Sequence, residues 1–313
     1  MYSELKIFGG RAHPALTKEI SDYLELDVGE VTLFDFSDGE TFFQIEENVR
    51  GRDVFVVQPT CPPVNSNFVE LLIMLDTFKR SSASRVTAVI PYYGYARQDK
   101  KDKPRVPITA KLVADLVSAA GADRILTMDV HAAQISGYFD VPVDHLFAAP
   151  VLLDEIRKLG LDEPMIVAPD AGGVARARAI AKRLDSDLAI VDKRRVAANQ
   201  AEVMNVIGNV EGRNVVIVDD IIDTGGTLVN TVESLKDQGA SGVYAVGIHG
   251  VLSGPALDRI NESALDKVLV TNTTPQEEKL SRCGKLVPLT VAPLLGEAIR
   301  RIHDNSSVSS LFV

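Results

Sequence analysis

The densest group of polar side chains in the chain comes directly after an apolar run. Val216–Val218 lead into Asp219-Asp220-Ile221-Ile222-Asp223-Thr224-Gly225-Gly226-Thr227. Carboxylates accept hydrogen bonds from hydroxyls, which suits the diol of a ribose. The Thr-Gly-Gly-Thr turn then opens a helix, where backbone N–H groups and threonine hydroxyls favour an anion. Diol acceptors beside a phosphate-binding turn predict a sugar-phosphate site, against the alternative of an ordinary Asp-rich turn with a threonine helix cap.

Three further polar groups also follow apolar runs. They are Asp129 with His131, Asp170-Ala171-Gly172-Gly173, and Asp192-Lys193-Arg194-Arg195. Ligands of open α/β sheets bind beyond the carboxyl ends of the strands, so we expect these groups to bind ligands. A Walker-type ATPase is excluded, because the only Gly-Lys pair, Gly284-Lys285, has Lys279 where the first glycine of that motif should be.

Short β-branched runs alternate with helical patterns along the whole chain. The candidate strands are Leu5–Phe8, Val54–Val57, Arg85–Ile90, Arg124–Met128, Met165–Ala168, Leu188–Val191, Val215–Val218, Val243–Ile248 and Lys267–Val270. Their residues are apolar consecutively, which is typical of strands covered by helices on both faces. The alternation predicts an α/β fold with mostly parallel sheets flanked by helices.

Two of the intervening helices can be placed from their apolar spacing. The first, Ala110–Ala120, brings four apolar residues onto one face: Leu112, Val113, Leu116 and Val117. The second, Thr227–Gln238, does the same with three: Leu228, Val232 and Leu235. Gly121 and Gly239 can end these helices, and we expect both apolar faces to be buried.

The chain repeats part of its own sequence. Asn48–Val57 (NVRGRDVFVV) echoes Asn209–Val218 (NVEGRNVVIV), and Ala83–Val89 echoes Ala240–Val246. The shared Asn-Val-x-Gly-Arg favours duplication over the general likeness of parallel strands. We predict two similar domains, residues 1–147 and 148–313, with the last ~25 residues packing back on the first domain. After the repeat the copies differ, and only the second continues into the Asp-rich loop.

Composition excludes several classes of protein. With 33 lysines and arginines against 43 aspartates and glutamates, the formal net charge is −10. Nucleic acids and anionic membranes both reward positive charge, so we predict neither as a partner. The sequence shows no run of ~18 apolar residues and no signal peptide, and its two cysteines form no disulfide framework or CxxC metal site. We therefore expect a cytoplasmic protein, and an enzyme.

Taken together, these motifs resemble a known family. Residues 216–227 look like the phosphoribosyl-diphosphate loop of the phosphoribosyltransferase superfamily. The whole chain is similar to the ribose-phosphate diphosphokinase, or phosphoribosyl-pyrophosphate synthetase, family. The supporting stretches are FSDGE at 36–40, YYGYARQD at 92–99, MDVHAAQ at 128–134, PDAGG at 169–173, DKRR at 192–195 and SVSSLF at 307–312. The resemblance implies two phosphoribosyltransferase-type domains that transfer the β,γ-diphosphate of MgATP to O1 of ribose 5-phosphate, releasing AMP.

The resemblance also implies roles for individual residues. Lys193 and Arg195 match the catalytic loop, and Arg195 also matches a ribose 5-phosphate contact. The other ribose 5-phosphate contacts would be Asp219, Asp220, Asp223, Thr224, Gly225, Gly226 and Thr227. The diphosphate loop would be Asp170, Ala171, Gly172 and Gly173. We expect the basic side chains of the helix that follows (Arg176, Arg178, Lys182 and Arg183) to be solvated or interfacial rather than catalytic.

On the same resemblance, ATP is the co-substrate and Mg²⁺ the cofactor. The matching ATP contacts are Phe36, Asp38, Gly39, Glu40, Arg97, Gln98, Asp99 and His131. Phe36 would stack on the base. His131 and Asp170 match the metal site, where Mg²⁺ would keep water and phosphate oxygens in its coordination shell.

The family further implies a homohexamer that is activated by phosphate and inhibited by ADP. Three segments of this chain resemble parts of the family's regulatory anion site: Arg50, Lys79-Arg80-Ser81-Ser82 and Ser309-Ser310. The alternatives are a catalytically silent regulatory homologue, suggested by the loop Val196–Gln200, and a simple phosphoribosyltransferase that shares only residues 216–227. The second alternative leaves the first domain unexplained.

Overall fold

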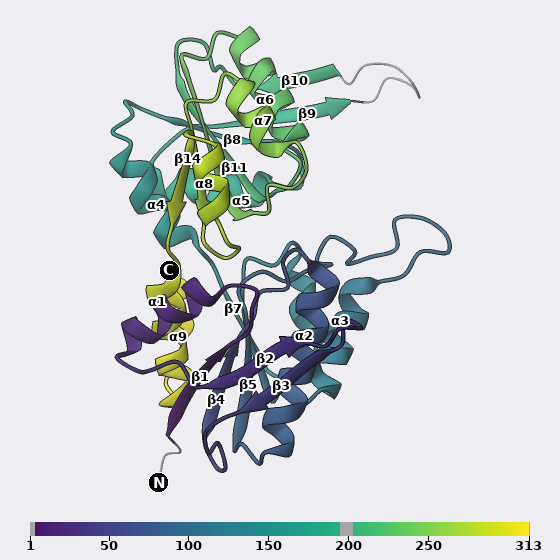
Figure 1. The fold of residues 1–313 in the computed structure, drawn as a ribbon. Helices are drawn as coiled ribbons and strands as arrows, with labels where there is room; N and C mark the ends of the chain where they lie inside the picture. The colour runs from purple at the N-terminus through teal and green to yellow at the C-terminus, as the bar shows by residue number, and fades with distance from the viewer. Residues whose placement is uncertain (1–3, 195–202, 313) are drawn as a thin grey trace. The chain divides into compact units, whose positions relative to one another are not determined.

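The computed structural model describes residues 4–194 and 203–312. The chain divides into two compact units, each with its own β-sheet (Figure 1). Unit 1 consists of Met1–Phe147, Thr273–Pro275 and Val291–Val313. Unit 2 consists of Ala148–Asn272 and Gln276–Thr290. The C-terminal helix therefore belongs to the same unit as the N-terminal strand.

Unit 1 is built on five parallel strands in the order β1-β4-β5-β6-β7. The strands are β1 (Leu5–Gly9), β4 (Asp53–Val57), β5 (Arg85–Ile90), β6 (Arg124–Met128) and β7 (Val143–Leu146). The helices are α1 (Pro14–Leu24), α2 (Val64–Arg80), α3 (Thr109–Ala119), α9 (Ala292–His303), and the short 3₁₀ segments η1 (Ala133–Tyr138) and η2 (Ser309–Phe312).

The strands of unit 1 are apolar on consecutive residues because both faces of the sheet are buried. On one face, Phe8, Val56 and Ala88 pack in a single core with residues of α2 and α3. The alternate residues, such as Ile7 and Phe55, are fully buried as well. Side chains alternate across a strand, so this pattern shows a sheet covered on both sides.

Strands β2 (Val31–Asp35) and β3 (Thr41–Ile45) form a separate antiparallel hairpin in unit 1. The Phe36 N–H donates to the Glu40 carbonyl at 2.8 Å, and Gly39 closes the turn with φ of 91°. Only Phe43 among these ten strand residues is buried. The turn can be predicted from the sequence but its strands cannot, because so few of their residues enter the core.

Unit 2 contains a seven-stranded sheet in the order β10-β9-β8-β11-β12-β13-β14, with only β10 antiparallel to its neighbour. The strands are β8 (Met165–Ala168), β9 (Leu188–Arg194), β10 (Val203–Ile207), β11 (Asn214–Ile222), β12 (Gly242–Gly250), β13 (Lys267–Thr271) and β14 (Leu286–Leu289). The helices are α4 (Ala149–Lys158), α5 (Val174–Leu184), α6 (Gly226–Asp237), α7 (Ala256–Glu262) and α8 (Glu277–Arg282). The predicted α/β fold with mostly parallel sheets is confirmed.

The two units share one strand order. The series β1-β4-β5-β6-β7 in unit 1 corresponds to β8-β11-β12-β13-β14 in unit 2. The repeated Asn-Val-x-Gly-Arg also folds the same way twice. Asn48 Oδ1 accepts the Arg50 N–H at 3.1 Å, as Asn209 Oδ1 accepts the Glu211 N–H at 3.2 Å. The repeat in the sequence thus marks a repeat in the structure.

One predicted helix face is wrong for two of its four residues, while Val113 and Val117 are buried as predicted. In α3 the buried residues are Ala110, Val113, Ala114 and Val117. Leu112 and Leu116 are instead 54% and 40% exposed. The small alanines let the helix backbone approach the core, which turns the leucines outward. The predicted face of α6, formed by Leu228, Val232 and Leu235, is confirmed.

Among the described residues, no helix is both long and apolar enough to cross a membrane. Cys61 and Cys283 are both buried as free thiols.

Candidate active site

The Asp-rich loop and the Asp-Ala-Gly-Gly loop leave unit 2 at the same edge of its sheet. Strands β8 and β11 are parallel neighbours, with Val215 opposite Met165. Asp219 and Asp220 lie on β11 itself, near its carboxyl end, because this strand runs four residues beyond the predicted Val218; the turn from Asp223 follows it, and the Asp-Ala-Gly-Gly loop follows β8. Arg176 on α5 links the two loops, since its Nη1 lies 3.4 Å from Asp220 Oδ1. The structure therefore brings together the predicted ribose 5-phosphate and diphosphate loops.

Asp219, which is half-buried, and Asp220, which is buried, form a pair of carboxylates at this edge. Asp219 Oδ1 accepts the backbone N–H of Asp220 at 2.9 Å, and Asp220 is 6% exposed. Burial raises the pKa of Asp219 to about 7, and the neighbouring carboxylates of Asp220 and Asp170 contribute in the same direction. Two adjacent carboxylates that are largely shielded from water resist carrying two full charges. The pair is thus suited to hydroxyl donors or to a cation that offsets its charge.

The turn after these carboxylates is fixed by unit 2 itself. Gly225 has φ of 73°, in the left-handed region, and a Cβ there would lie 3.4 Å from Ala256 Cα. The Ser253 hydroxyl donates to Asp223 Oδ1, and Arg259 Nη1 donates to the Thr224 carbonyl at 2.9 Å. Helix α6 begins directly after this glycine. Amides of a first helical turn favour an anion, which agrees with a phosphate site.

The second loop of the site leads into α5. Asp170 Oδ1 accepts the Gly173 N–H at 3.0 Å, which folds Asp170–Gly173 into a tight turn before the helix. Ala171 and Gly172 are exposed, and a Cβ on Gly172 would lie 3.2 Å from Asp170 Oδ1. The small residues leave the loop backbone accessible, as close approach of a diphosphate requires.

One of the two predicted catalytic residues, Lys193, lies on the next strand of the same sheet. Lys193 is the sixth residue of β9, which pairs with β8, and its backbone is opposite Met204 of β10. Arg195 lies outside the described residues. The carboxyl end of β9 therefore follows the same edge as the two loops described above, which is where the sequence expects the catalytic lysine.

The predicted ATP contacts of unit 1 occupy two loops and a hairpin. The loops follow β5 and β6, which are parallel neighbours. A hydrogen bond joins these loops, from Gln134 Nε2 to Asp99 Oδ2 at 2.6 Å. Arg97, Gln98 and His131 are exposed, whereas Asp99 is 5% exposed. Asp99 thus connects the loops, while the other three present side chains to solvent.

His145 of β7 supports the loop that carries His131. Its Nε2 accepts the Val130 N–H at 3.1 Å, so the proton of the neutral ring resides on Nδ1. Burial lowers the pKa of His145 to about 4, which keeps the ring a neutral acceptor near pH 7. The sequence analysis missed this residue, because a lone histidine at the end of a strand gives no signal.

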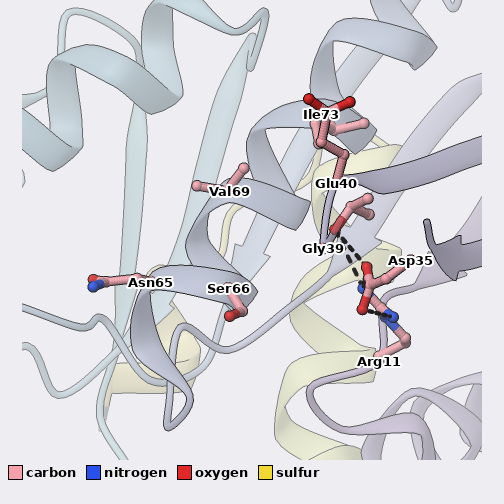
Figure 2. Close-up of a pocket in the computed structure, with 9 residues that line it drawn as sticks. Arg11, Asp35, Gly39, Glu40, Asn65, Ser66, Val69 and Ile73 are labelled. Carbon is pink, nitrogen blue, oxygen red and sulfur yellow. Dashed lines mark hydrogen bonds and ion pairs between the residues drawn. The ribbon is translucent and has the colours of Figure 1, made fainter. Parts of the chain in front are cut away.

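The turn Phe36–Glu40 carries the remaining predicted ATP contacts at the tip of the β2–β3 hairpin. Phe36 is 48% exposed, and its ring centroid lies 5.2 Å from that of Phe34. Asp38 Oδ1 accepts the Glu40 N–H at 3.1 Å. A pocket of about 570 Å³ separates this turn from α2, with Arg11 and Asp35 joined at one end (Figure 2). Its lining residues are Arg11, Asp35, Gly39, Glu40, Thr41, Asn65, Ser66, Val69 and Ile73.

Within the described part of the chain, no three His, Cys, Asp or Glu side chains gather into a metal-binding group. Of the two predicted metal ligands, His131 belongs to unit 1 and Asp170 to unit 2. A half-buried carboxylate such as Asp170 fits Mg²⁺, which typically takes one or two protein carboxylates and fills its shell with water and phosphate oxygens.

One arginine behaves differently from its prediction. Arg178, Lys182 and Arg183 are exposed, as expected, but Arg176 is 24% exposed and pairs with Asp220. Arg176 is only two residues before the exposed Arg178, but it lies on the side of α5 that packs against β11. Sequence spacing alone did not reveal which basic residue of this helix faces the carboxylates.

Fold and site together define a protein with two phosphoribosyltransferase-type domains, and known proteins agree. A family model described as the N-terminal domain of ribose phosphate pyrophosphokinase matches residues 5–121. A second, the phosphoribosyl synthetase-associated domain, matches residues 194–313. The crystal structure of phosphoribosylpyrophosphate synthetase from Mycobacterium smegmatis aligns with a TM-score of 0.92 at 43% identity, covering 97% of this chain and 100% of that one.

Curated relatives match over nearly the whole length. The chain is 55% identical to ribose-phosphate pyrophosphokinase from Helicobacter pylori, over 98% of this chain and 96% of the relative. It is 54% identical to the protein of that name from Vibrio parahaemolyticus, over 99% of each. The chain belongs to the ribose-phosphate pyrophosphokinase family. The resemblance inferred from the motifs is confirmed, and a simple phosphoribosyltransferase that shares one loop is excluded.

Proposed function

We propose that this protein is an active ribose-phosphate diphosphokinase. It transfers the β,γ-diphosphate of MgATP to O1 of ribose 5-phosphate, giving 5-phosphoribosyl 1-diphosphate and AMP for nucleotide biosynthesis. The observation that carries the proposal is 55% identity over 98% of the chain to a relative that bears this enzyme's name. The carboxylate pair Asp219–Asp220 and the phosphate-type turn of unit 2 give the proposal a chemical basis.

Unit 2 would bind ribose 5-phosphate through the carboxyl end of β11 and the turn that follows it. Asp219 and Asp220 would accept hydrogen bonds from the ribose hydroxyls. Asp223–Thr227 would hold the 5-phosphate with backbone N–H groups and threonine hydroxyls, helped by the positive end of α6. The guanidinium of Arg195 would contact the same substrate with a positive charge. The ribose hydroxyls can donate hydrogen bonds directly to the carboxylate pair. Binding of the ribose by Asp219 and Asp220 is therefore the best supported assignment of the site.

The Asp170–Gly173 loop would hold the transferring diphosphate through its backbone N–H groups. Mg²⁺, bound with Asp170 and with His131 of the ATP side, would supply charge neutralisation for the phosphate oxygens. Arg176 would keep Asp220 oriented, because the guanidinium holds one of its carboxylate oxygens.

Unit 1 would bind ATP. Phe36 would stack on adenine, with Asp38, Gly39 and Glu40 on the same turn contacting the nucleoside. Arg97 and Gln98 would contact the nucleotide from the loop after β5, while Asp99 holds that loop against Gln134. His131 would reach the phosphates from the loop that His145 supports.

Lys193 and Arg195 would be the catalytic residues. Attack at the β-phosphorus builds negative charge on non-bridging oxygens, and phosphoryl-type transfer depends on meeting that charge rather than on covalent chemistry. The cations of Lys193, on β9, and of Arg195 would supply this stabilisation. No general acid or base is required of them.

The family resemblance adds expectations about assembly and regulation. We propose a cytoplasmic homohexamer with a phosphate and ADP regulatory site. The exposed Leu112 and Leu116 on α3 are apolar surface available for subunit contacts. The regulatory segments at Arg50 and Ser82 adjoin each other, since the Gly51 N–H donates to the Ser82 carbonyl at 2.8 Å. A phosphate titration with no activation up to tens of millimolar would remove the regulatory part.

The first test is AMP release from MgATP with and without ribose 5-phosphate. ³¹P NMR would check that the product is a diphosphorylated sugar. We expect AMP only when ribose 5-phosphate is present. AMP formation that does not depend on the sugar, or none at all while MgATP still binds, would contradict the proposal and favour the silent regulatory homologue.

A further inference from the structure

The β2–β3 hairpin is gripped beside its turn by one arginine. Arg11 comes from the loop between β1 and α1, and its Nη1 and Nη2 lie 2.8 Å and 2.7 Å from the two oxygens of Asp35. Nη2 also reaches the Thr41 hydroxyl at 3.4 Å. Asp35 and Thr41 are paired across the hairpin and flank the turn Phe36–Glu40. The guanidinium therefore holds the hairpin at the base of its turn.

Arg11 is itself held by a buried acid. Its Nε donates to Glu70 Oε2 at 2.6 Å and its backbone N–H to Glu70 Oε1 at 2.7 Å. Glu70 lies on α2 and its side chain is 2% exposed. The Gln58 amide donates to the same Oε1 at 3.0 Å, and the Gln58 carbonyl oxygen accepts the Ala12 N–H at 3.2 Å. Charge-assisted bonds from two sides make this a rigid base for the guanidinium.

The other contacts of the turn lie largely within the hairpin, where the Phe36 ring contacts those of Phe34 and Phe42, while Val31, Leu33 and Ile45 pack on the core of unit 1. The hairpin is a separate two-stranded sheet, and isolated hairpins are marginally stable in water. Its one buried residue, Phe43, lies beyond the turn on β3. Beside the turn a pocket of about 570 Å³ takes the place of packed side chains between the hairpin and α2 (Figure 2). The link from Asp35 through Arg11 to Glu70 spans one end of that pocket.

We propose that Arg11 and Asp35 are positioning residues for ATP, which set the place of the Phe36–Glu40 turn without being catalytic residues themselves. The inference rests on the proposed function, which assigns adenine binding to this turn. We call the linked side chains of Asp35, Arg11 and Glu70 the clamp. A turn held in the binding geometry loses less conformational freedom when the nucleotide binds, so the clamp raises ATP affinity by preorganisation. It has no corresponding effect on ribose 5-phosphate, whose loops belong to unit 2.

The clamp is expected to persist over the working pH range. Hydrogen bonds from Arg11, together with one from Thr41, lower the pKa of Asp35 to about 2. The carboxylate and the guanidinium thus both stay charged from about pH 4 upward.

The test uses the exposed end of the clamp, because removing Arg11 would leave Glu70 buried without its cation. Asp35→Ala should raise the KM for ATP about fivefold, the scale of a partly exposed ion pair. The kcat at saturating ATP and the KM for ribose 5-phosphate should stay within about twofold. Asp35→Glu keeps the carboxylate and should recover most of the ATP affinity. Arg11→Lys keeps the charge but loses the two-pronged geometry, so it should fall between wild type and Asp35→Ala.

A matched control is Asp22→Ala, which removes an exposed carboxylate ion-paired with Lys18 on α1 of the same unit. It should leave every kinetic constant unchanged. An unchanged KM for ATP in Asp35→Ala overturns the inference. So does a change of equal size in kcat or in the KM for ribose 5-phosphate, because the carboxylate would then act through the fold as a whole.

Failure of the proposed function can be told apart from failure of the clamp. If the wild-type protein forms no AMP, calorimetric titration with MgATP tests the clamp alone. A fivefold weaker Kd in Asp35→Ala then supports it, and an equal Kd overturns it. Absence of MgATP binding by the wild-type protein overturns both proposals.

Discussion

Two equivalent strand ends in this molecule have opposite chemistry. Gln58 follows Val57 of β4, and Asp219 follows Val218 at the matching position of the repeat in β11. The Gln58 amide is fully buried and bonded to Ala12, Asn67 and Glu70 of its own unit. Asp219 instead adjoins a second carboxylate, and its pKa rises to about 7. The Gln58 amide is hydrogen-bonded within its own unit, whereas at the second position two carboxylates lie side by side, one of them paired with Arg176.

The two units also differ in the hairpin that each contains, β2–β3 in unit 1 and β9–β10 in unit 2. Each follows the first strand and helix of its unit, but β2–β3 stands apart while β9–β10 extends the main sheet. The first carries predicted ATP contacts at its turn, and the second carries Lys193 near the carboxyl end of β9. Duplication would thus have given one scaffold two tasks, with substrate positioning in unit 1 and transition-state stabilisation in unit 2.

The largest expected effect tests this division between the hairpins. Lys193→Ala should lower kcat by about a hundredfold to a thousandfold with a modest change in the KM for ATP, because the lysine would act mainly in the transition state. Phe36→Ala on the other hairpin should raise the KM for ATP and leave kcat closer to wild type. Steady-state kinetics of both variants would decide. If Lys193→Ala keeps a kcat near wild type, the role assigned to that lysine is wrong.

The next effect separates the two strand ends. Asp220→Asn should raise the KM for ribose 5-phosphate by about tenfold or more, since hydrogen bonds to a charged acceptor are worth about 1.5–3 kcal/mol. Gln58→Ala at the other strand end should leave that KM unchanged. It should instead destabilise unit 1 by about 1–3 kcal/mol, because Ala12 and Glu70 lose a buried partner. Thermal unfolding measures stability, and substrate titration measures the KM for ribose 5-phosphate. If both variants changed stability alone, or both changed this KM alone, the contrast between the two strand ends would be wrong.

A smaller effect concerns pH. Asp219 keeps its proton up to about pH 7 in the folded protein but loses it near 3.8, its ordinary value, when unfolded. Between these values the unfolded state binds fewer protons, so stability falls as pH rises and levels off above about 7. Asp219→Asn should therefore remove part of the loss in Tm between pH 5 and pH 8 in substrate-free protein.

Asp35 supplies the contrast for the pH experiment. Its pKa is lowered to about 2, so its contribution to stability is present above the ordinary value near 3.8 and is lost only as pH falls toward 2. Asp35→Asn should thus leave the change in Tm between pH 5 and pH 8 as in wild type. A pH dependence that is equal in wild type and Asp219→Asn would contradict the assigned shift.

The sequence predicted the fold largely because its main strands are buried on both faces. Runs such as Val54–Val57 and Val215–Val218 are apolar throughout, and no surface pattern competes with that signal. The strands it missed, among them β2, β7 and β10, are short or include polar residues such as Asp144 and His145. In α3, burial of small alanines reversed the expected role of Leu112 and Leu116, because the approach of a helix to a sheet is not encoded in hydrophobicity alone.

The candidate site divides along the same line. Motifs formed by neighbouring residues, such as Asp219–Thr227 and Asp170–Gly173, were visible in the sequence and adjoin one another in unit 2. Residues that act across the fold were not visible. Arg11 meets Asp35 over 24 positions and Glu70 over 59, and Arg176 meets Asp220 over 44. Each is an ordinary charged residue until the fold brings its partner near.

The smallest effect is the sharpest test of duplication. Gly51 and Gly212 occupy the same place in the two Asn-Val-x-Gly-Arg turns, with φ of 72° and 70°, and an added Cβ would meet no atom within 4 Å at either. Gly51→Ala and Gly212→Ala should each cost about 1 kcal/mol through backbone strain alone, or a Tm loss of about 2–4 °C. Gly284→Ala, at an equally open position without positive φ, should cost less. If the losses of stability in the two variants differed by more than about 1 kcal/mol, the likeness of the turns would be limited to their local backbone geometry. The two units would then hold their turns by different contacts.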